Sequence, residues 1–127
     1  MYELKPFREV KNQLFKFHKL TVDNRCLFDE FENSLCQPSD IKALGAIYSL
    51  MECFGNLLLP KTKFNHIVGG KKDPGNVFEF KKNNIRVYVM MQKPDVIVIL
   101  GGFKTAQKKD IEKIFSIVKD WIKETER

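Results

Sequence analysis

The chain has 127 residues, of which 43% are hydrophobic and 30% are charged, and this composition is typical of a globular domain rather than a disordered chain. The length predicts one domain over residues 1–127, with a core that needs neither disulfides nor metal. No apolar run reaches the length of a membrane span and the N-terminus lacks the apolar core of a signal peptide, so we expect a cytoplasmic protein.

Positive charge is concentrated in the second half of the chain. Residues 1–60 have a net charge of −1, whereas residues 61–127 have a net charge of +7. A basic half of this kind favours a polyanionic partner, such as nucleic acid or an acidic protein segment. A merely solvated, lysine-rich surface would give the same count.

The three cysteines, Cys26, Cys36 and Cys53, are odd in number and lack a close Cys-x-x-Cys pair. They therefore indicate neither a disulfide framework nor a zinc site. We expect them to be reduced residues of the core, and we expect no metal or other cofactor.

The first half of the chain predicts one strand followed by two helices. Residues 12–22 are rich in aromatic and β-branched residues and predict an edge strand. Asp23 is suited to cap a first helix, and Ser39 is suited to cap a second helix that ends at Gly55. The apolar stripes of the two helices are Leu27, Phe28, Phe31 and Leu35, then Ile41, Leu44, Ile47, Tyr48, Met51 and Phe54.

Residues 56–76 predict an irregular, basic connector. Pro60, Gly69-Gly70 and Asp73-Pro74-Gly75 are turn signals. The basic residues of this segment are Lys61, Lys63, Lys71 and Lys72.

Residues 77–102 have the clearest pattern, with three short apolar runs separated by turn residues. Asn83-Asn84 favours a two-residue hairpin turn because asparagine tolerates positive φ. Lys93-Pro94-Asp95 predicts the next turn. After this meander, Gln107 to Glu124 predicts an amphipathic helix whose apolar side packs on the sheet. That side contains Ile111, Ile114, Phe115, Val118, Trp121 and Ile122.

The hairpin turn fixes the register of the first two strands of the meander. On the core face it pairs Phe80 with Val87 and Phe78 with Val89; on the other face it pairs Glu79 with Tyr88 and Lys81 with Arg86. The third strand is expected to place Val96, Val98 and Leu100 on the core face and Ile97, Ile99, Gly101 and Phe103 on the other, with Gly101 beside Arg86.

The element order predicts an α+β fold. We expect a small antiparallel sheet, made of the N-terminal strand and the three-strand meander, with the helical hairpin and the C-terminal helix on one face. The other face would then be an open, basic, partly aromatic floor. Its residues are Lys81, Arg86, Tyr88 and Phe103, with Glu79 at the edge.

From Phe64 to Ile114 the chain resembles the RelE/ParE superfamily of bacterial toxins, and more closely its RelE/HigB-like branch, which includes phage-derived members. Three pieces carry the resemblance in order. They are a Phe-Glu-Phe-Lys strand at 78–81, an Ile-Arg-Val strand at 85–87, and an apolar strand at 96–104 that ends in a small residue, Phe and Lys.

The resemblance implies a type II toxin that cuts messenger RNA on the ribosome and is neutralised by an acidic antitoxin protein, with no membrane or metal involved. The implied reaction is attack of a ribose 2′-hydroxyl on the adjacent phosphate, giving a cyclic phosphate and a free 5′-hydroxyl. This reaction needs a base for the hydroxyl, an acid for the leaving oxygen and positive groups for the phosphorane charge.

The resemblance also implies roles for individual residues. Arg86 is the candidate for holding the scissile phosphate, because a guanidinium binds phosphate bidentately. Lys81 and Lys104 would stabilise developing charge. His66 suits acid or base work at neutral pH, and Glu79 is a further candidate base, although a structural role is open for each of the two. Residues expected to contact RNA are Lys63, Lys71, Lys72, Tyr88, Phe103 and Lys108.

The chain departs from the family pattern at the proton-transfer positions. Some members carry a histidine at about Gly101, many have a second lysine where this chain has Thr105, and no tyrosine or histidine follows the last helix. Two other functions therefore stay open. One is a non-catalytic, ParE-like toxin that binds DNA gyrase, and the other is an inactive prophage-derived module that binds RNA or protein.

Overall fold

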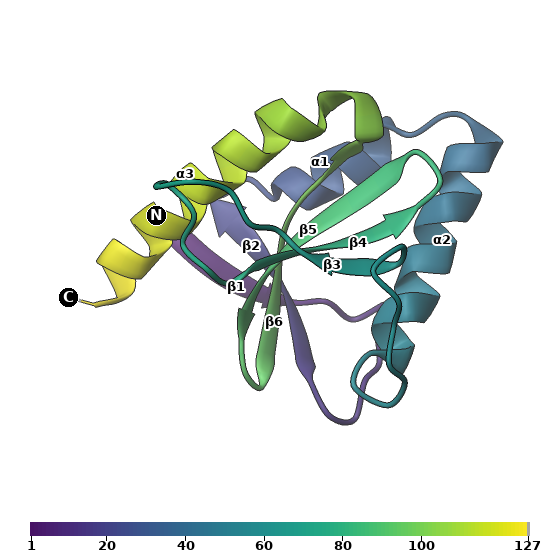
Figure 1. The fold of residues 1–127 in the computed structure, drawn as a ribbon, viewed down its shortest axis with the longest axis horizontal. Coiled ribbons are helices and arrows are strands. Elements are labelled where there is room, and N and C mark those ends of the chain that lie inside the picture. The colour runs from purple at the N-terminus through teal and green to yellow at the C-terminus, as the bar shows by residue number, and fades with distance from the viewer. Residues whose placement is uncertain (127) are drawn as a thin grey trace.

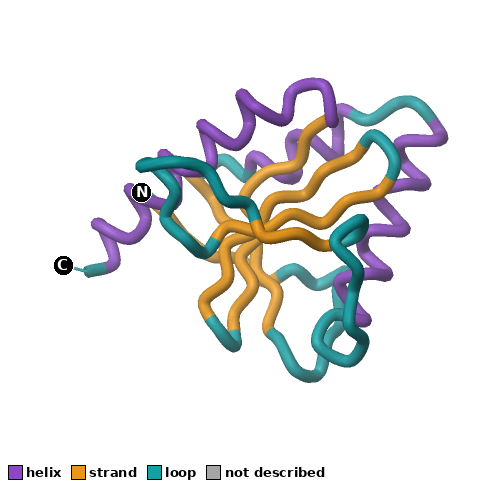
Figure 2. The backbone as a smooth tube through the Cα atoms, in the orientation of Figure 1, coloured by secondary structure: helices purple, strands orange, loops and turns teal. Residues whose placement is uncertain are grey.

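The fold is built on one mixed sheet in the order β1-β2-β6-β5-β4-β3 (Figure 1 and Figure 2). The structure is a computed structural model and describes residues 1–126. In chain order its elements are β1 (Tyr2–Pro6), β2 (Lys16–Val22), α1 (Leu27–Ser34), α2 (Pro38–Cys53), β3 (Phe64–His66), β4 (Val77–Lys82), β5 (Ile85–Gln92), β6 (Asp95–Phe103), the short 3-10 helix η1 (Lys104–Ala106) and α3 (Gln107–Thr125).

The predicted hairpin of β4 and β5 is confirmed, including its register. Asn83 has a φ of 51°, as a tight two-residue turn requires. Lys81 faces Arg86 and Glu79 faces Tyr88. The sequence therefore predicted which residues share each face of these two strands.

The pairing of β5 with β6 contains an irregularity between Tyr88 and Val89. A bulge of this kind reverses the faces of all residues beyond it. Leu100 therefore joins the core on the α3 side, whereas Gly101 and Phe103 lie against Phe31 of α1. The predicted faces of these three residues were wrong, and the residue opposite Arg86 is Gly102.

Helices cover both faces of the sheet, so the prediction of a single covered face was wrong (Figure 1). α1 and α2 pack on one face over Phe80, Val87 and Val98. α3 packs on the opposite face over Met90 and Ile97. Because both faces are covered, the central strands β5 and β6 are almost wholly buried, which explains their nearly continuous apolar sequences.

The N-terminal part of the sheet also differs from the prediction. The expected edge strand at residues 12–22 is the shorter β2, and it lies inside the sheet because β1 pairs with its outer side. β2 runs parallel to β6, so the sheet is mixed rather than antiparallel. The irregular connector contributes the three-residue strand β3, which extends the sheet beyond β4.

The two predicted helices of the first half are present, with different N-terminal residues. α1 begins after Cys26, because Asp23 lies in a turn with a φ of 51°. α2 begins after Gln37, and Pro38 rather than Ser39 opens the first turn, where its missing N–H is no loss. Gly55 follows α2 with a φ of 89°, as predicted for its end.

Two of the three cysteines do not belong to the core. Cys36 and Cys53 are exposed and only Cys26 is partly buried, and none forms a disulfide within residues 1–126. In the same part of the chain, no helix combines the length and the apolar character that crossing a membrane requires.

Candidate functional site

A buried pair of opposite charges lies on the α3 face of the sheet. Arg86 is 8% exposed and Glu79 is 3% exposed, and Nε of Arg86 lies 3.8 Å from Oε1 of Glu79. Nη1 of Arg86 donates hydrogen bonds to the carbonyl oxygens of Asn83 (2.8 Å) and Ile85 (3.0 Å). Arg86 thus fixes the β4–β5 turn, in addition to any role in binding.

Glu79 is held by two amide side chains as well as by Arg86. Oε1 accepts a hydrogen bond from Nε2 of Gln107 at 2.8 Å, and Oε2 accepts one from Nδ2 of Asn65 at 3.2 Å. Gln107 is the first residue of α3, so this contact ties the helix to the sheet. A carboxylate with both oxygens engaged is poorly placed to accept a further proton, which favours the structural role for Glu79.

Asp110 supplies a second carboxylate at the same place. Its Oδ2 lies 2.1 Å from the position that a Cβ atom at Gly102 would occupy, so Asp110 covers the glycine opposite Arg86. Burial raises the pKa of Asp110, and the charges of Lys113 and Lys109 offset this effect only in part. Unlike Glu79, Asp110 remains partly exposed.

Tyr88 lies beneath these charged groups. Burial raises the pKa of the Tyr88 phenol, and the charges of Asp110 and Glu79 raise it further. Its hydroxyl has no hydrogen-bond partner within residues 1–126. A fully buried ring is not available for stacking on a base, so the RNA contact predicted for Tyr88 has no support in the structure. We call Glu79, Arg86, Tyr88, Gln107 and Asp110 the polar cluster.

Sequence reasoning missed Asp110. An acidic residue in the first turn of a helix is ordinarily interpreted as a favourable partner of the helix dipole. The signal that distinguishes Asp110 is the pair of glycines in β6, because Gly102 leaves the space that its carboxylate fills. The bulge that places Gly102 there is not visible in the sequence.

Two of the predicted cationic residues border the polar cluster. Lys81 is partly buried and lies opposite Arg86, which lies opposite Gly102. The backbone N–H of Lys104 donates to the carbonyl oxygen of Asn84 at 2.8 Å, so exposed Lys104 stands beside the β4–β5 turn. Lys81, Arg86 and Lys104 are therefore brought together, as predicted.

The structure separates His66 and Phe103 from this group. His66 stacks on Phe78, with ring centroids 4.5 Å apart, and its Nε2 lies 2.9 Å from the carbonyl oxygen of Gly75. Phe103 contacts Phe31. Phe78 and Phe103 both pack with the α1–α2 core, on the face opposite Arg86, so neither His66 nor Phe103 reaches the polar cluster.

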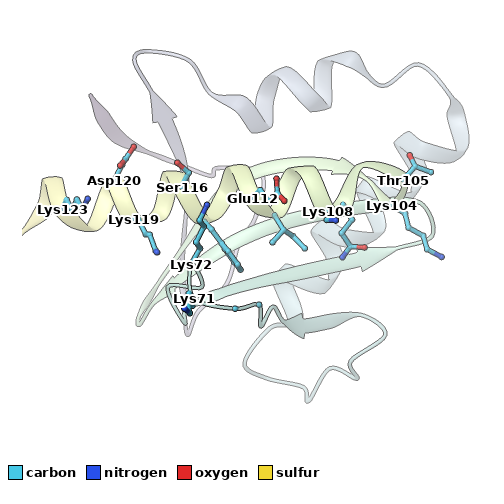
Figure 3. A pocket seen from close by; sticks show the side chains of 15 residues that line it. Lys71, Lys72, Lys104, Thr105, Lys108, Glu112, Ser116, Lys119, Asp120 and Lys123 are labelled. Carbon is cyan, nitrogen blue, oxygen red and sulfur yellow. The ribbon is translucent and has the colours of Figure 1, made fainter.

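A groove of about 1300 Å³ runs between α3 and the loop that contains Gly69 and Gly70. Figure 3 shows lysines along the helix and on the facing loop. We call it the lysine groove. Its six lysines are Lys71, Lys72, Lys104, Lys108, Lys119 and Lys123, and its two carboxylates are Glu112 and Asp120. The predicted RNA contacts Lys71, Lys72 and Lys108 lie here, whereas Lys63 does not line it.

The lysine groove and the polar cluster share a residue. Gln107 lines the groove and donates to Glu79, and Lys104 lies at the same end. The lysine groove therefore adjoins the buried polar cluster at the start of α3, near the β4–β5 turn.

Comparison with known proteins identifies no relative. No protein-family model, no curated protein and no solved structure matches the chain. Chemical inference about the site therefore depends on its own residues.

The arrangement is suited to binding an anion and offers one carboxyl for proton transfer. Within residues 1–126 no group of three His, Cys, Asp or Glu residues is placed to hold a metal ion. Lys81 and Lys104 are accessible cations beside Arg86. Asp110, whose pKa burial raises, covers Gly102 on the strand next to Arg86. The charges that partly offset its raised pKa are those of Lys113 and Lys109. A perturbed carboxyl next to several cations is the kind of group that functional sites contain.

Proposed function

We propose that this protein is a RelE/HigB-like type II toxin that cuts messenger RNA on the ribosome in the cytoplasm and is neutralised by an acidic antitoxin protein. The observation that carries the proposal is that Lys81, Arg86 and Lys104 lie together beside the β4–β5 turn, where Lys104 also lines the lysine groove and Asp110 covers the glycine opposite Arg86. The order of N-terminal strands, a helical hairpin, a meander and a final helix also agrees with the order that the resemblance implies, although β1 and β3 are additional strands.

The site supports a division of roles in 2′-hydroxyl attack on phosphate. Lys104 and Lys81 would contact the phosphate and stabilise the phosphorane charge. Arg86 would add positive charge from below while it holds the turn and Glu79. Asp110 would accept the 2′-hydroxyl proton, because a raised pKa brings a carboxyl closer to the operating pH of a general base. The ammonium of exposed Lys104 would donate a proton to the leaving 5′-oxygen as the bond from phosphorus to that oxygen breaks.

A specific observation favours a second function, in which the protein binds RNA without cutting it. Arg86 is paired with Glu79 and donates to two carbonyl oxygens, so it is not free to bind phosphate bidentately. In addition, His66 lies on the opposite face of the sheet. Under this alternative, the groove binds RNA and the buried pair is purely structural.

The test is controlled expression in bacteria of the wild type, Arg86→Ala, Lys104→Gln and Asp110→Asn, with growth and messenger RNA 5′ ends measured. We expect growth arrest and new 5′ ends for the wild type. Both should be lost in Asp110→Asn and strongly reduced in Lys104→Gln. The Lys104→Gln and Asp110→Asn variants are included because Arg86→Ala removes a buried charged residue and can unfold the chain. A loss of activity in Arg86→Ala alone would therefore not identify a catalytic role.

The matched control is Lys42→Gln, which removes an exposed lysine of α2 that lies outside the groove. This variant should arrest growth as the wild type does. Arrest without new 5′ ends would contradict the nuclease. Absence of arrest with a folded wild type that still binds RNA would support the binding protein.

A further inference from the structure

One side of α3 carries a stripe of groove residues along its length. Lys108, Ile111, Glu112, Phe115, Ser116, Lys119 and Lys123 all line the lysine groove. Their spacings of three and four residues place them on a single side of the helix. From Lys108 to Lys123 the stripe spans about 22 Å, at 1.5 Å per residue. This length reaches well beyond the polar cluster at the start of the helix.

The opposite wall of the groove is also basic. Lys71 and Lys72 belong to the loop before β4. Gly69 of the same loop packs against Phe115, because a Cβ atom at Gly69 would lie 3.6 Å from the Phe115 ring. Lysines thus stand on both sides of the groove floor (Figure 3). With six lysines and two carboxylates, the groove has a formal charge of +4.

The floor of the groove lacks the features that would bind bases or an apolar peptide face. Phe115 is its sole aromatic residue and is 6% exposed, so it cannot offer a ring face for stacking. An amphipathic protein helix needs several apolar anchors at helical spacing, and the floor offers only half-buried Ile111 beside Phe115. The charge of the groove is therefore predominantly cationic, and it is carried by lysines that border an apolar floor.

We propose that the lysine groove is a track for the phosphate backbone of a single-stranded nucleic acid, and that Lys119 and Lys123 extend it to the C-terminal half of α3. The track binds phosphate charge and does not contact the bases, so single-stranded DNA and RNA of equal length bind with similar affinity. This inference rests on the proposed function for its biological substrate, but the binding itself needs no cleavage.

The experiment measures fluorescence anisotropy of a labelled oligodeoxythymidine against protein concentration at several salt concentrations. For single strands, log K falls with log salt with a slope of about −0.7 for each phosphate contact, so four contacts give a slope of about −3. The variant Lys119→Gln/Lys123→Gln should remove two contacts and reduce the slope to about half. An oligouridine should give the same slope.

The matched control is Lys16→Gln/Lys42→Gln, which removes the same charge from two exposed lysines outside the groove. If the two double variants reduce the affinity and the salt slope equally, the proposal that the groove binds the phosphate backbone is wrong. It is also wrong if the wild type shows no saturable binding at low salt. Competition by polyglutamate of equal charge is a second test. If polyglutamate displaces the probe as well as unlabelled oligodeoxythymidine does, the groove accepts an acidic protein segment instead.

The deoxy probe has no 2′-hydroxyl, so this experiment separates the track from the nuclease. Cleavage in cells without binding in this assay would overturn the track alone. Binding that depends on Lys119 and Lys123 without cleavage would overturn the nuclease alone.

Discussion

At the residue scale, we expect Asp110 to lower the stability of the fold at neutral pH and to be required for RNA cleavage. Its folded-state pKa is raised, so its contribution to stability is present below the unfolded-state pKa and is lost as pH rises through the folded-state pKa. At neutral pH the ionised carboxylate is therefore a cost that Asp110→Asn removes. We expect this variant to have a higher urea midpoint than the wild type at pH 7, and about 100-fold slower RNA cleavage.

The pH dependence gives this prediction a second measurement. The stability gain of Asp110→Asn should shrink as pH falls through the raised folded-state pKa and should be absent below the unfolded-state value of about 3.9, because the wild-type carboxyl is then protonated in both states. A variant with unchanged cleavage and a lower urea midpoint at pH 7 would show that Asp110 is only a structural residue.

Unlike Asp110, Asp29 is expected to stabilise the fold at neutral pH. Burial alone would raise its pKa, but hydrogen bonds from Lys19 and Lys5 outweigh burial and hold the pKa below its ordinary value. Lys19 is a buried ammonium, with a side chain 6% exposed, that lies 2.7 Å from Oδ1 of Asp29. Within residues 1–126, Asp29→Asn would leave the Lys19 ammonium with Glu9, at 3.8 Å, as its one carboxylate partner, beside the ring of Phe7. We expect the free energy of unfolding of Asp29→Asn to be about 2 kcal/mol lower than that of the wild type at pH 7.

The direction in which the stability contribution of Asp29 changes with pH follows from its lowered pKa. Its contribution is complete above the unfolded-state pKa of about 3.9 and disappears as pH falls through the lower folded-state pKa. The difference in unfolding free energy between wild type and Asp29→Asn should therefore close in acid. Glu3→Gln, at an exposed carboxylate of β1, is the control and should change stability by less than about 0.5 kcal/mol.

At the element scale, the contact between β6 and α1 depends on a missing side chain. A Cβ atom at Gly101 would lie 2.3 Å from Cδ2 of Phe31, and an aromatic ring packed in a core cannot move away easily. We expect Gly101→Ala to cost about 1–3 kcal/mol. The histidine that some RelE-family members carry at about this position would meet the same obstacle here.

A double-mutant cycle measures this contact directly. In the background of Phe31→Ala, the cost of Gly101→Ala should fall by about 1 kcal/mol or more. Gly45→Ala is the matched control, because nothing lies within 4 Å of its Cβ position. In the middle of α2 it should stabilise the protein by about 0.5–1 kcal/mol. Equal costs for Gly101→Ala in both backgrounds would rule out the steric explanation.

The elements that could be predicted are those with a strong local signal. The β4–β5 register follows from Asn83-Asn84, and α3 follows from an apolar stripe in which Ile114 and Trp121 are indeed buried. In α2 the stripe was only partly correct, because Ile41 is 53% exposed. Local patterns find an element but do not say how much of its apolar side a neighbouring element covers.

The features that could not be predicted depend on distant contacts. β1 and β3 are short edge strands whose sequences carry no clear alternation, so only their partners make them strands. The bulge in β6 lies within an unbroken apolar run, and it alone decides that Gly102 faces α3. For the site, the placement of Lys81 opposite Arg86 was predictable from register and that of Lys104 followed from the resemblance, whereas Asp110 and the opposite placement of His66 were not predicted.

At the scale of the whole molecule, stability should be greatest at the centre of the sheet. β5 and β6 are paired on both sides and covered on both faces, whereas β1 and β3 lie at the edges. In native-state hydrogen exchange we expect the slowest amides in β5 and β6, exchanging by global unfolding. The amides of β3 should exchange at least tenfold faster. Equal protection of β3 and β5 would contradict this ordering.

The parallel pairing of β2 with β6 has a consequence for biosynthesis. Residues 16–19 find their sheet partners at residues 95–98, so β2 cannot pair with β6 until residue 98 has emerged from the exit tunnel. A nascent or prematurely terminated chain lacks α3, and with it the lysine groove and Asp110. Only a chain that extends through α3 therefore carries the proposed activity, and a ribosome that has not yet synthesised α3 does not hold a working copy of the site.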